Sequence, residues 1–295
     1  MSPVLFALPG NERIGEALKS YAALEMGHVE FRRFPDEESY VRLLTPVRER
    51  AAVLVCTLDR PDSKILPLLL AAQAARELGA RQIGLVAPYL AYMRQDKRFQ
   101  PGEAVSSRLF AGILSRAVDW LVTVDPHLHR IGSLADIYDI PAHAVHAAPL
   151  ISRWIRGNIS SPLLIGPDEE SKQWVGAVAS GAGAPHLVLQ KVRRGDRDVE
   201  ITMPDISPWR GATPVLIDDI ISSARTMIEA LGHLRRANMR PAVCIGVHGV
   251  FVPGAYEALR AAGPSRIVTS NTIAHETNAI DAAPLLAQAM AGLLP

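Results

Sequence analysis

The chain has 295 residues, enough for two domains of ordinary size that each bury a core. Its 31 basic and 30 acidic residues leave a formal net charge of +1, so no overall positive charge is available to bind nucleic acid. Cys56 and Cys244 both lie in apolar runs, which excludes a disulfide framework and a cysteine metal site. No apolar run approaches the ~20 residues of a membrane span, and the N-terminus lacks a charged leader, so we expect a cytoplasmic protein that binds no membrane.

The first half alternates short apolar runs, typical of strands, with longer helical patterns. The predicted strands are VLFAL (4–8), AAVLVCT (51–57), QIGLVAPY (82–89) and WLVTVD (120–125). The predicted helices are ILPLLLAAQAARELG (65–79) and SSRLFAGILSRA (106–117). The polar stretch 93–107, which contains Pro101 and Gly102, is expected to be a mobile loop.

The second half repeats this alternation. The predicted strands are PLLIGPD (162–168), HLVLQKVR (186–193), TPVLIDD (213–219), AVCIGVHG (242–249) and RIVTSNT (266–272). The predicted helices are SKQWVGAVAS (171–180), ARTMIEALGHLRRAN (224–238) and PGAYEALRAAG (253–263). We therefore expect two similar α/β domains, each with a mainly parallel β-sheet flanked by helices. The boundary falls within 139–149 and divides the chain into 1–145 and 146–295, with the last helix a candidate to pack back on the first domain.

The stretch VLIDDIISSARTM (215–227) carries the most specific chemistry. Val215–Ile217 form a predicted buried strand, and Asp218 and Asp219 emerge at its end, where open parallel sheets bind ligands. A turn rich in small and hydroxyl side chains then leads into a predicted helix, whose first N–H groups favour binding of a phosphate. The turn comprises Ser222, Ser223, Ala224, Arg225 and Thr226. The carboxylates would repel that phosphate, so we expect them to accept hydrogen bonds from sugar hydroxyls. The alternative is a helix N-terminus capped by serine and aspartate.

Two further sets of residues are candidates for binding charged groups. His127 and Asp168 each follow an apolar strand pattern, one in each half, although a lone histidine there is more often structural. Lys191 and Arg193 are two residues apart in an extended segment and so point the same way; the alternative is a solvated charged loop.

The sequence resembles a known family in six segments. The 215–227 stretch resembles the phosphoribosyl-diphosphate (PRPP) loop of type I phosphoribosyltransferases and of ribose-phosphate diphosphokinases (PRPP synthetases). The other five resemble diphosphokinase segments in that family's order: FRRFPDEESYVRL (31–43), APYLAYMRQDKRF (87–99), TVDPHLHRI (123–131), IGPDEESKQWV (165–175) and LQKVRR (189–194). Simple phosphoribosyltransferases are usually a single such domain, so the resemblance favours the diphosphokinases, and the compact segments resemble the archaeal type.

The resemblance implies two phosphoribosyltransferase-like domains, the first binding ATP and the second ribose 5-phosphate. It implies Mg²⁺-dependent transfer of the diphosphoryl group of ATP to the anomeric hydroxyl of ribose 5-phosphate, giving PRPP and AMP. By resemblance, His127 contacts a magnesium ion complexed with ATP, and Asp168 lies near a second ion. Lys191 and Arg193 are implied to stabilise the transferring group, whereas Asp218, Asp219 and the turn 222–226 hold ribose 5-phosphate.

For ATP, the resemblance assigns an aromatic and two acidic side chains to the adenine. Phe34 would stack on the base, and Asp36 and Glu38 would accept hydrogen bonds from its amino group. In diphosphokinases this segment reaches into the active site of a neighbouring subunit, which implies a homo-oligomer, at least a dimer. Arg94, Gln95 and Asp96 would line the nucleotide from the same chain as His127.

Three departures from the family pattern lie at binding turns. Arg225 stands where the PRPP loop usually has glycine, and we expect its side chain to point away from the phosphate. Glu37 occupies the usual glycine of the adenine segment, and 169–171 replace a glycine-containing turn. The retained His127, Asp168, Lys191 and Arg193 favour an active enzyme. The alternatives are a catalytically silent regulatory subunit and a phosphoribosyltransferase.

Overall fold

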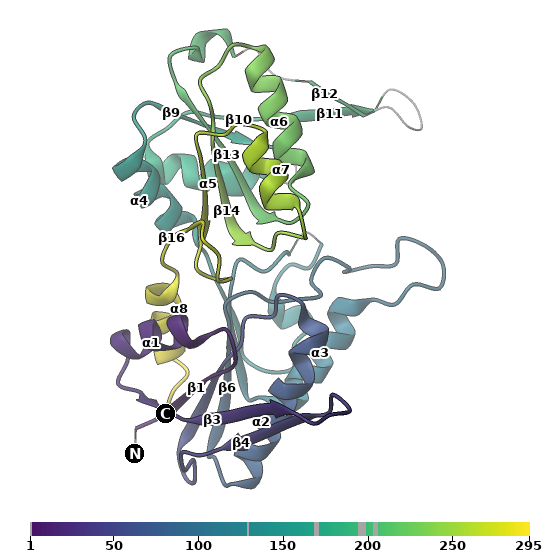
Figure 1. Cartoon of the computed structure of the whole chain (residues 1–295), viewed down its shortest axis with the longest axis vertical. Helices are drawn as coiled ribbons and strands as arrows, with labels where there is room; N and C mark the ends of the chain where they lie inside the picture. The colour runs from purple at the N-terminus through teal and green to yellow at the C-terminus, as the bar shows by residue number, and fades with distance from the viewer. Residues whose placement is uncertain (1, 129, 168–170, 194–198, 203–205) are drawn as a thin grey trace. The chain divides into compact units, whose positions relative to one another are not determined.

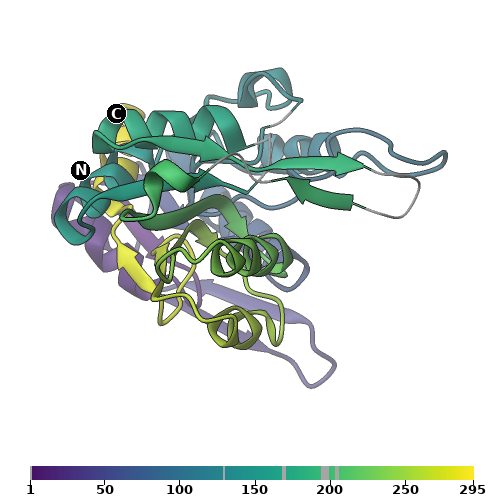
Figure 2. The same ribbon diagram turned by 90° about the horizontal axis from the view of Figure 1, so that it is seen from above.

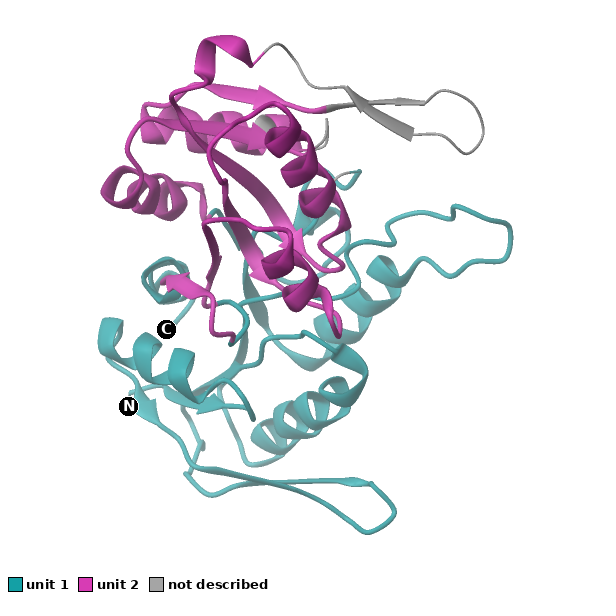
Figure 3. Ribbon diagram, turned by 45° about the horizontal axis from the view of Figure 1, so that its top comes forward, with its two compact units in different colours: residues 1–146, 272–274, 282–295 teal, residues 147–271, 275–281 magenta. Residues whose placement is uncertain are grey.

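The structure, a computed structural model, describes residues 2–128, 130–167, 171–193, 199–202 and 206–295. For residues 173, 190–193 and 199–202 it describes the backbone alone. The chain divides into two compact units (Figure 3): unit 1 comprises residues 1–146, 272–274 and 282–295, and unit 2 comprises residues 147–271 and 275–281. The division lies beside the expected boundary after residue 145, but the expected C-terminal domain is interrupted, because residues 272–274 and 282–295 belong to unit 1.

Unit 1 is built on a six-stranded parallel sheet with the order β2-β1-β5-β6-β7-β8 (Figure 1). Its strands are β1 (Val4–Ala7), β2 (Glu25–Met26), β5 (Ala51–Val55), β6 (Gln82–Ala87), β7 (Trp120–Val124) and β8 (Ala142–Val145). Strands β5 and β7 are buried along their whole length, as expected for a parallel sheet covered on both faces. A Cβ on Gly84 would lie 1.9 Å from Trp120, so the indole needs a glycine at this point of β6.

Two pairs of helices cover the sheet of unit 1. They are α1 (Glu12–Tyr21) with α8 (Ala283–Ala291), and α2 (Ile65–Glu77) with α3 (Ser106–Ala117), each pair in mutual contact. Ile14 and Leu18 of α1 and Leu286 and Met290 of α8 are buried at a spacing of four residues, so each helix turns one apolar face inward. Helix α8 packs against α1, β7 and β8, which is why the C-terminal segment belongs to unit 1.

A two-stranded ribbon is inserted between β2 and β5. Strands β3 (Val29–Arg33) and β4 (Ser39–Leu43) pair antiparallel, and β4 contacts α2. Short 3₁₀ helices, η1 (Pro61–Ser63) and η2 (Leu134–Asp136), lie in the connections of unit 1. Ser133 and Asp136 form a capping box that fixes the start of η2.

Unit 2 repeats the architecture with a six-stranded parallel sheet in the order β10-β9-β13-β14-β15-β16. Its strands are β9 (Pro162–Gly166), β10 (His186–Val188), β13 (Thr213–Ile221), β14 (Val243–Gly249), β15 (Arg266–Ser270) and β16 (Asn278–Ile280). A ribbon of β11 (Gln190–Arg193) and β12 (Val199–Thr202) is inserted between β10 and β13, and η4 (Ser207–Trp209) follows it. The predicted class of two mainly parallel α/β domains is confirmed.

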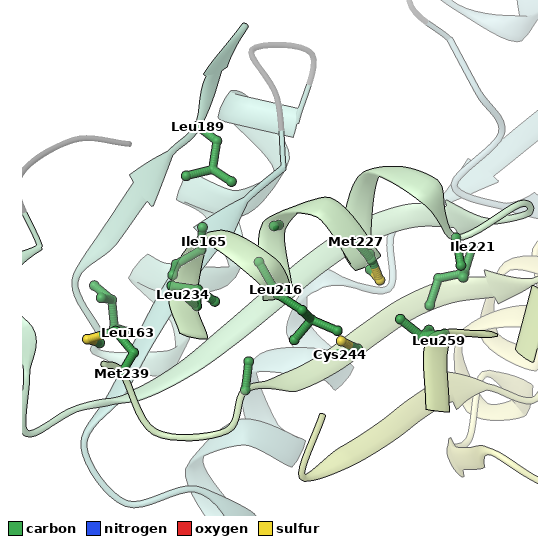
Figure 4. Close-up of a cluster of buried hydrophobic side chains, with 14 of the residues drawn as sticks. Leu163, Ile165, Leu189, Leu216, Ile221, Met227, Leu234, Met239, Cys244 and Leu259 are labelled. Carbon is green, nitrogen blue, oxygen red and sulfur yellow. The ribbon is translucent and has the colours of Figure 1, made fainter. Parts of the chain in front are cut away.

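The helices of unit 2 are α4 (Ala148–Asn158), α5 (Lys172–Ala182), α6 (Arg225–Arg236) and α7 (Ala255–Ala261). Helix α4 packs against α5, and α6 lies beside α7 (Figures 1 and 2). The buried side chains of α6 recur at helical spacing: Met227, Ala230, Leu231 and Leu234. They join Leu216 of β13, Cys244 of β14 and Leu259 of α7 in one apolar core (Figure 4).

Candidate functional site

Strand β13 carries the two adjacent carboxylates. It pairs with β9 as far as Leu216 but with β14 as far as Ile221. Among the described residues, the pairing of β13 at Asp218 and beyond is with β14, and both aspartates are half-buried. The Asp219 N–H donates to Asp218 Oδ1 at 3.0 Å. The predicted strand 213–219 is confirmed and is two residues longer, because pairing with β14 carries β13 on to Ile221.

The turn after β13 leads directly into α6. The connection between β14 and α7 holds its backbone in place. The carbonyls of Ile221 and Ser222 accept hydrogen bonds from the N–H groups of Phe251 (3.0 Å) and Val252 (3.2 Å). The first N–H groups of a helix have no intrahelical partner, so the start of α6 offers donors to an anion. Ser222 and Thr226 are half-buried and Ser223 is exposed. The segment thus places hydroxyls, helix N–H groups and two carboxylates in sequence, a combination that suits a sugar phosphate.

The residue with a left-handed backbone conformation in this turn is Ala224, not Arg225. Ala224 has φ 59° and ψ 5°, in the left-handed region, and is the N-cap of α6 without a side-chain hydrogen bond. The alternative of a serine or aspartate cap is therefore wrong, because the alanine at this position has no side-chain acceptor. Arg225 is exposed, begins the helix and has no positive φ, so the arginine imposes no left-handed strain where the family usually has glycine.

The proposed catalytic cations lie on the ribbon of unit 2. Lys191 and Arg193 belong to β11, opposite Ile201 and Val199 of β12. Their side chains are outside the described part of the structure, so their roles stay predictions. The same holds for Asp168 and for several neighbours of the predicted sites: His129, Glu169, Glu170, Arg194 and Arg197.

The predicted nucleotide segment Arg94–Asp96 lies in the connection between β6 and α3. Gln95 is tied to the start of α3, since Ser106 Oγ donates to Gln95 Oε1 (2.7 Å) and the Ser107 N–H donates to the Gln95 carbonyl (3.3 Å). The Asp96 side chain is 2% exposed, and both of its carboxylate oxygens accept from Arg130 Nη1, at 3.1 and 3.3 Å. Arg94 is exposed. The segment is therefore held at Gln95 and Asp96 while Arg94 faces solvent.

His127 follows the end of β7 and is half-buried. Two residues before it, Asp125 is buried and has a positive φ of 31°. Asp125 Oδ1 lies 2.8 Å from Nδ1 of the exposed His146. This hydrogen bond raises the pKa of His146, because the carboxylate stabilises the imidazolium, and partial burial opposes the shift. The sequence offered one signal for the pair, an aspartate at the end of a buried strand.

Phe34, Asp36 and Glu38 lie in the connection between β3 and β4, and all three are exposed. The Phe34 ring is 40% exposed and meets Tyr40 edge to face, with centroids 6.1 Å apart. The Arg32 guanidinium lies 4.5 Å from the centroid of Phe34 and 3.9 Å from that of Tyr40. Arg32 belongs to the 31–43 segment, but no role was predicted for it from the sequence. Its cation stacks on the ring proposed to bind adenine.

A cavity of about 320 Å³ lies against the β3–β4 ribbon, at the strand residues next to its connecting turn. Its lining comes from the ribbon, from the carboxyl ends of β1 and β5, and from η1 and α2, and includes Leu8, Phe31, Arg32, Tyr40, Cys56 and Lys64. The residues at the tip of the ribbon, Phe34, Asp36 and Glu38, are not part of this lining. The cavity and the predicted adenine residues therefore do not coincide.

The predicted residues divide between the units by ligand. Those for the nucleotide, at 34–38, 94–96 and 127, belong to unit 1, and those for the sugar phosphate, at 218–226, belong to unit 2. Within unit 1, Arg130 joins the 94–96 segment to the segment of His127. Among the described residues, no group of three or more histidine, cysteine or acidic side chains could hold a metal.

Two family models match the chain in succession. Residues 3–117 match the N-terminal domain of ribose phosphate pyrophosphokinase, and residues 133–283 match the phosphoribosyl transferase domain. Over 293 residues the chain is 33% identical to the ribose-phosphate pyrophosphokinase of Methanopyrus kandleri, spanning 98% of this chain and 99% of that protein. It is 34% identical over 263 residues to the Saccharolobus solfataricus protein of the same name, spanning 88% of this chain and 89% of that protein.

A solved structure has the same fold. The phosphoribosylpyrophosphate synthetase of Mycobacterium smegmatis matches with a TM-score of 0.86 over 99% of both chains, at 24% sequence identity. Of the helices in the described ranges, none combines the length and apolar character needed to span a membrane.

Proposed function

Because the chain belongs to the ribose-phosphate pyrophosphokinase family, we propose that it transfers the diphosphoryl group of ATP to ribose 5-phosphate, giving PRPP and AMP. The anomeric hydroxyl oxygen forms a bond to the β-phosphorus of ATP. The bond from that phosphorus to the α,β-bridging oxygen breaks, AMP leaves with this oxygen, and the hydroxyl proton passes to solvent. Such a displacement depends on in-line positioning and charge neutralisation, and needs no covalent intermediate with the protein.

The observation that carries the proposal is the junction of β13 and α6. Half-buried Asp218 and Asp219 interrupt the buried residues of β13, and after Ile220 and Ile221 the small-residue turn leads into the helix start. In the proposed complex the carboxylates accept hydrogen bonds from the ribose hydroxyls. The turn 222–226 and the first N–H groups of α6 bind the 5-phosphate.

The nucleotide side is proposed to lie in unit 1. Arg94, Gln95 and Asp96 form its same-chain segment, and the exposed Arg94 is available to a polyphosphate. Phe34, Asp36 and Glu38 would serve the adenine of a neighbouring subunit in a homo-oligomer, a role that their exposure on a projecting ribbon supports. Lys191 and Arg193 would stabilise the diphosphoryl group as charge moves toward AMP, each contributing roughly 10²–10³ in rate.

Mg²⁺ is the proposed metal. It prefers oxygen ligands and keeps several waters, so one or two protein ligands per ion suffice beside phosphate oxygens. The half-buried His127, which follows β7, supports a single contact from the protein to such an ion. His127 would hold the ion complexed with ATP, and Asp168 would lie near a second. When bound, the metal neutralises charge on the transferring group.

The proposal is tested by product analysis. The purified chain is incubated with Mg²⁺, ATP and ribose 5-phosphate, and AMP, ADP and PRPP are quantified by chromatography. We expect AMP and PRPP in equal amounts, and neither after the metal is chelated. ADP in place of AMP would mean ordinary kinase chemistry. A chain that forms no product but changes the activity of another PRPP synthetase would be a regulatory subunit.

A further inference from the structure

One ion pair connects the two segments of unit 1 that are proposed to serve ATP. Asp96 lies in the β6–α3 connection, directly after Arg94 and Gln95. Arg130 lies in the connection after β7, close in sequence to His127. Arg130 Nη1 bridges the two carboxylate oxygens of Asp96 at 3.1 and 3.3 Å.

In this ion pair the aspartate is buried, whereas the arginine is partly exposed to solvent. The Asp96 side chain is 2% exposed, against 43% for Arg130. The Arg130 guanidinium also lies 5.4 Å from the ring centroid of Phe99 in the same connection as Asp96. Arg130 therefore covers the carboxylate and touches the Asp96 connection at a second point.

This geometry argues against direct contact between Asp96 and the nucleotide. A buried carboxylate is costly unless a cation and hydrogen bonds compensate it, and Arg130 supplies both. Beside a triphosphate an uncompensated carboxylate would also repel the ligand. The Asp96 charge is engaged before any ligand arrives, so its effect on ATP has to pass through Arg130.

We propose that Asp96 and Arg130 are positioning residues whose ion pair holds the Arg94–Gln95 segment in fixed register with the segment of His127. The inference rests on the proposed function, in which both segments bind the same Mg·ATP. Gln95 is anchored separately to α3 through Ser106 and Ser107. The Arg130 contact supplies the second anchor, on the His127 side. Breaking the pair from either side releases the same constraint and weakens ATP binding.

A double-mutant cycle tests the pair. ATP binding is measured by calorimetry with Mg²⁺ and without ribose 5-phosphate, so that no turnover is needed, for Asp96→Asn, Arg130→Gln and the double variant. Each single variant is expected to weaken ATP binding about ten-fold or more, the usual effect of losing a charge-assisted hydrogen bond. The double variant is expected to lose much less than the product of the two single effects, because both changes break one interaction.

Two comparisons separate positioning from general damage. Arg108→Gln removes an exposed positive charge from α3, outside the segments proposed to bind ATP, and should leave ATP affinity within about two-fold. Arg130→Lys should keep more affinity than Arg130→Gln, because a single nitrogen makes the observed contact to both oxygens. In steady-state assays the KM for ATP should rise while the KM for ribose 5-phosphate stays within about two-fold.

Three outcomes would overturn the inference: additive effects in the cycle, loss in one single variant alone, or equal rises in both KM values. Loss in Asp96→Asn alone would make Asp96 a direct ligand, and loss in Arg130→Gln alone would make Arg130 one. These results are distinct from failure of the proposed function, which would appear as absence of AMP and PRPP from the parent protein that still binds ATP.

Discussion

Glu37, at the tip of the β3–β4 ribbon, has a backbone φ of 70°, in the left-handed region that side chains with a Cβ disfavour. Its carboxylate is 85% exposed and lies 4.0 Å from Arg33, a surface pair that adds little stability. The backbone hydrogen bond from the Glu37 N–H to the Phe34 carbonyl (2.9 Å) holds the turn in place. The residue therefore carries backbone strain with little compensation from its side chain.

We expect Glu37→Gly to stabilise the protein by about 0.5–1 kcal/mol, because glycine adopts a positive φ without a Cβ clash. Glu30→Gly is the matched control, since Glu30 lies in β3 of the same ribbon and has no positive φ. It should destabilise by about 0.5–1 kcal/mol through lost strand order. Thermal unfolding of both variants checks the pair, and a destabilised Glu37→Gly would contradict the strain argument.

Arg225 offers the second test at the scale of one residue. It is exposed at the start of α6, and the left-handed position of the turn is Ala224. If its side chain points away from the 5-phosphate, Arg225→Gly should bind ribose 5-phosphate within a few tenths of a kcal/mol of the parent, roughly the effect of a surface substitution. Calorimetric titration of ribose 5-phosphate measures this.

A direct Arg225 ligand predicts a different result. Losing a charge-assisted hydrogen bond of about 1.5–3 kcal/mol would raise the ribose 5-phosphate Kd about ten-fold or more. Thr226→Val, which keeps the shape of the same turn but removes a proposed phosphate ligand, should weaken binding and serves as the comparison. A large loss in Arg225→Gly would refute the outward orientation.

At the scale of elements, the β11–β12 ribbon is proposed to act in the transition state. Lys191→Ala and Arg193→Ala should each lower kcat by roughly 10²–10³ while changing ATP binding much less. Arg210→Ala removes another exposed cation of unit 2, beyond η4, and should leave kcat unchanged. Steady-state kinetics with direct ATP titration separates the two effects, and unchanged kcat in both ribbon variants would remove the ribbon from catalysis.

The elements that the sequence predicted correctly are those buried in the two sheets. β5, β7 and β14 are buried throughout, and their unbroken apolar runs set them apart from their surroundings. The β3–β4 ribbon escaped prediction because its residues are half-buried or exposed, and its few apolar residues alternate with charged ones over too short a stretch to form an apolar run. The short edge strands β2 and β16 likewise lack a sequence signal.

The site was predictable as segments but not as contacts. Asp218 and Asp219 stood out as candidates because two adjacent carboxylates follow an apolar run and precede a helix pattern. The bond of Asp125 to His146 and that of Asp96 to Arg130 join residues far apart in the chain. The sequence alone gives no sign that either residue of these two pairs has a charged partner. The partners come together because β6, β7 and β8 are neighbouring parallel strands of one sheet.

At the scale of the whole molecule, the two units share one topology. In unit 1 the first strand, β1, lies between β2 and β5, and in unit 2 the first strand, β9, lies between β10 and β13. In both sheets the remaining strands then follow in chain order. This equates β5 with β13. Cys56 and Thr57 follow β5. Cys56 is buried with its pKa raised to about 12, and Thr57 Oγ1 donates to the Thr272 carbonyl at 2.5 Å. Unit 1 therefore has packed side chains directly after β5, whereas β13 of unit 2 carries two carboxylates.

The chain should accordingly bind one ribose 5-phosphate, in unit 2. Titration calorimetry at saturating ligand should give a stoichiometry of about one per chain, since among the strands that the structure describes only β13 carries two adjacent carboxylates. Asp218→Ala with Asp219→Ala should abolish this binding by removing the acceptors for the ribose hydroxyls. A second equivalent of ligand, or binding that survives in the double variant, would contradict the assignment.

Helix α8 gives unit 1 a particular dependence on its own synthesis. Leu286 and Met290 bury completely in unit 1, each contributing roughly 1.5–3 kcal/mol, a large part of the marginal stability of a domain. Unit 2 ends at residue 281, whereas unit 1 requires residues 282–295. On the ribosome, most of unit 1 is therefore synthesised before unit 2 but can complete its fold only after unit 2 has been synthesised. Until α8 has left the exit tunnel, the surface of unit 1 that α8 covers stays exposed.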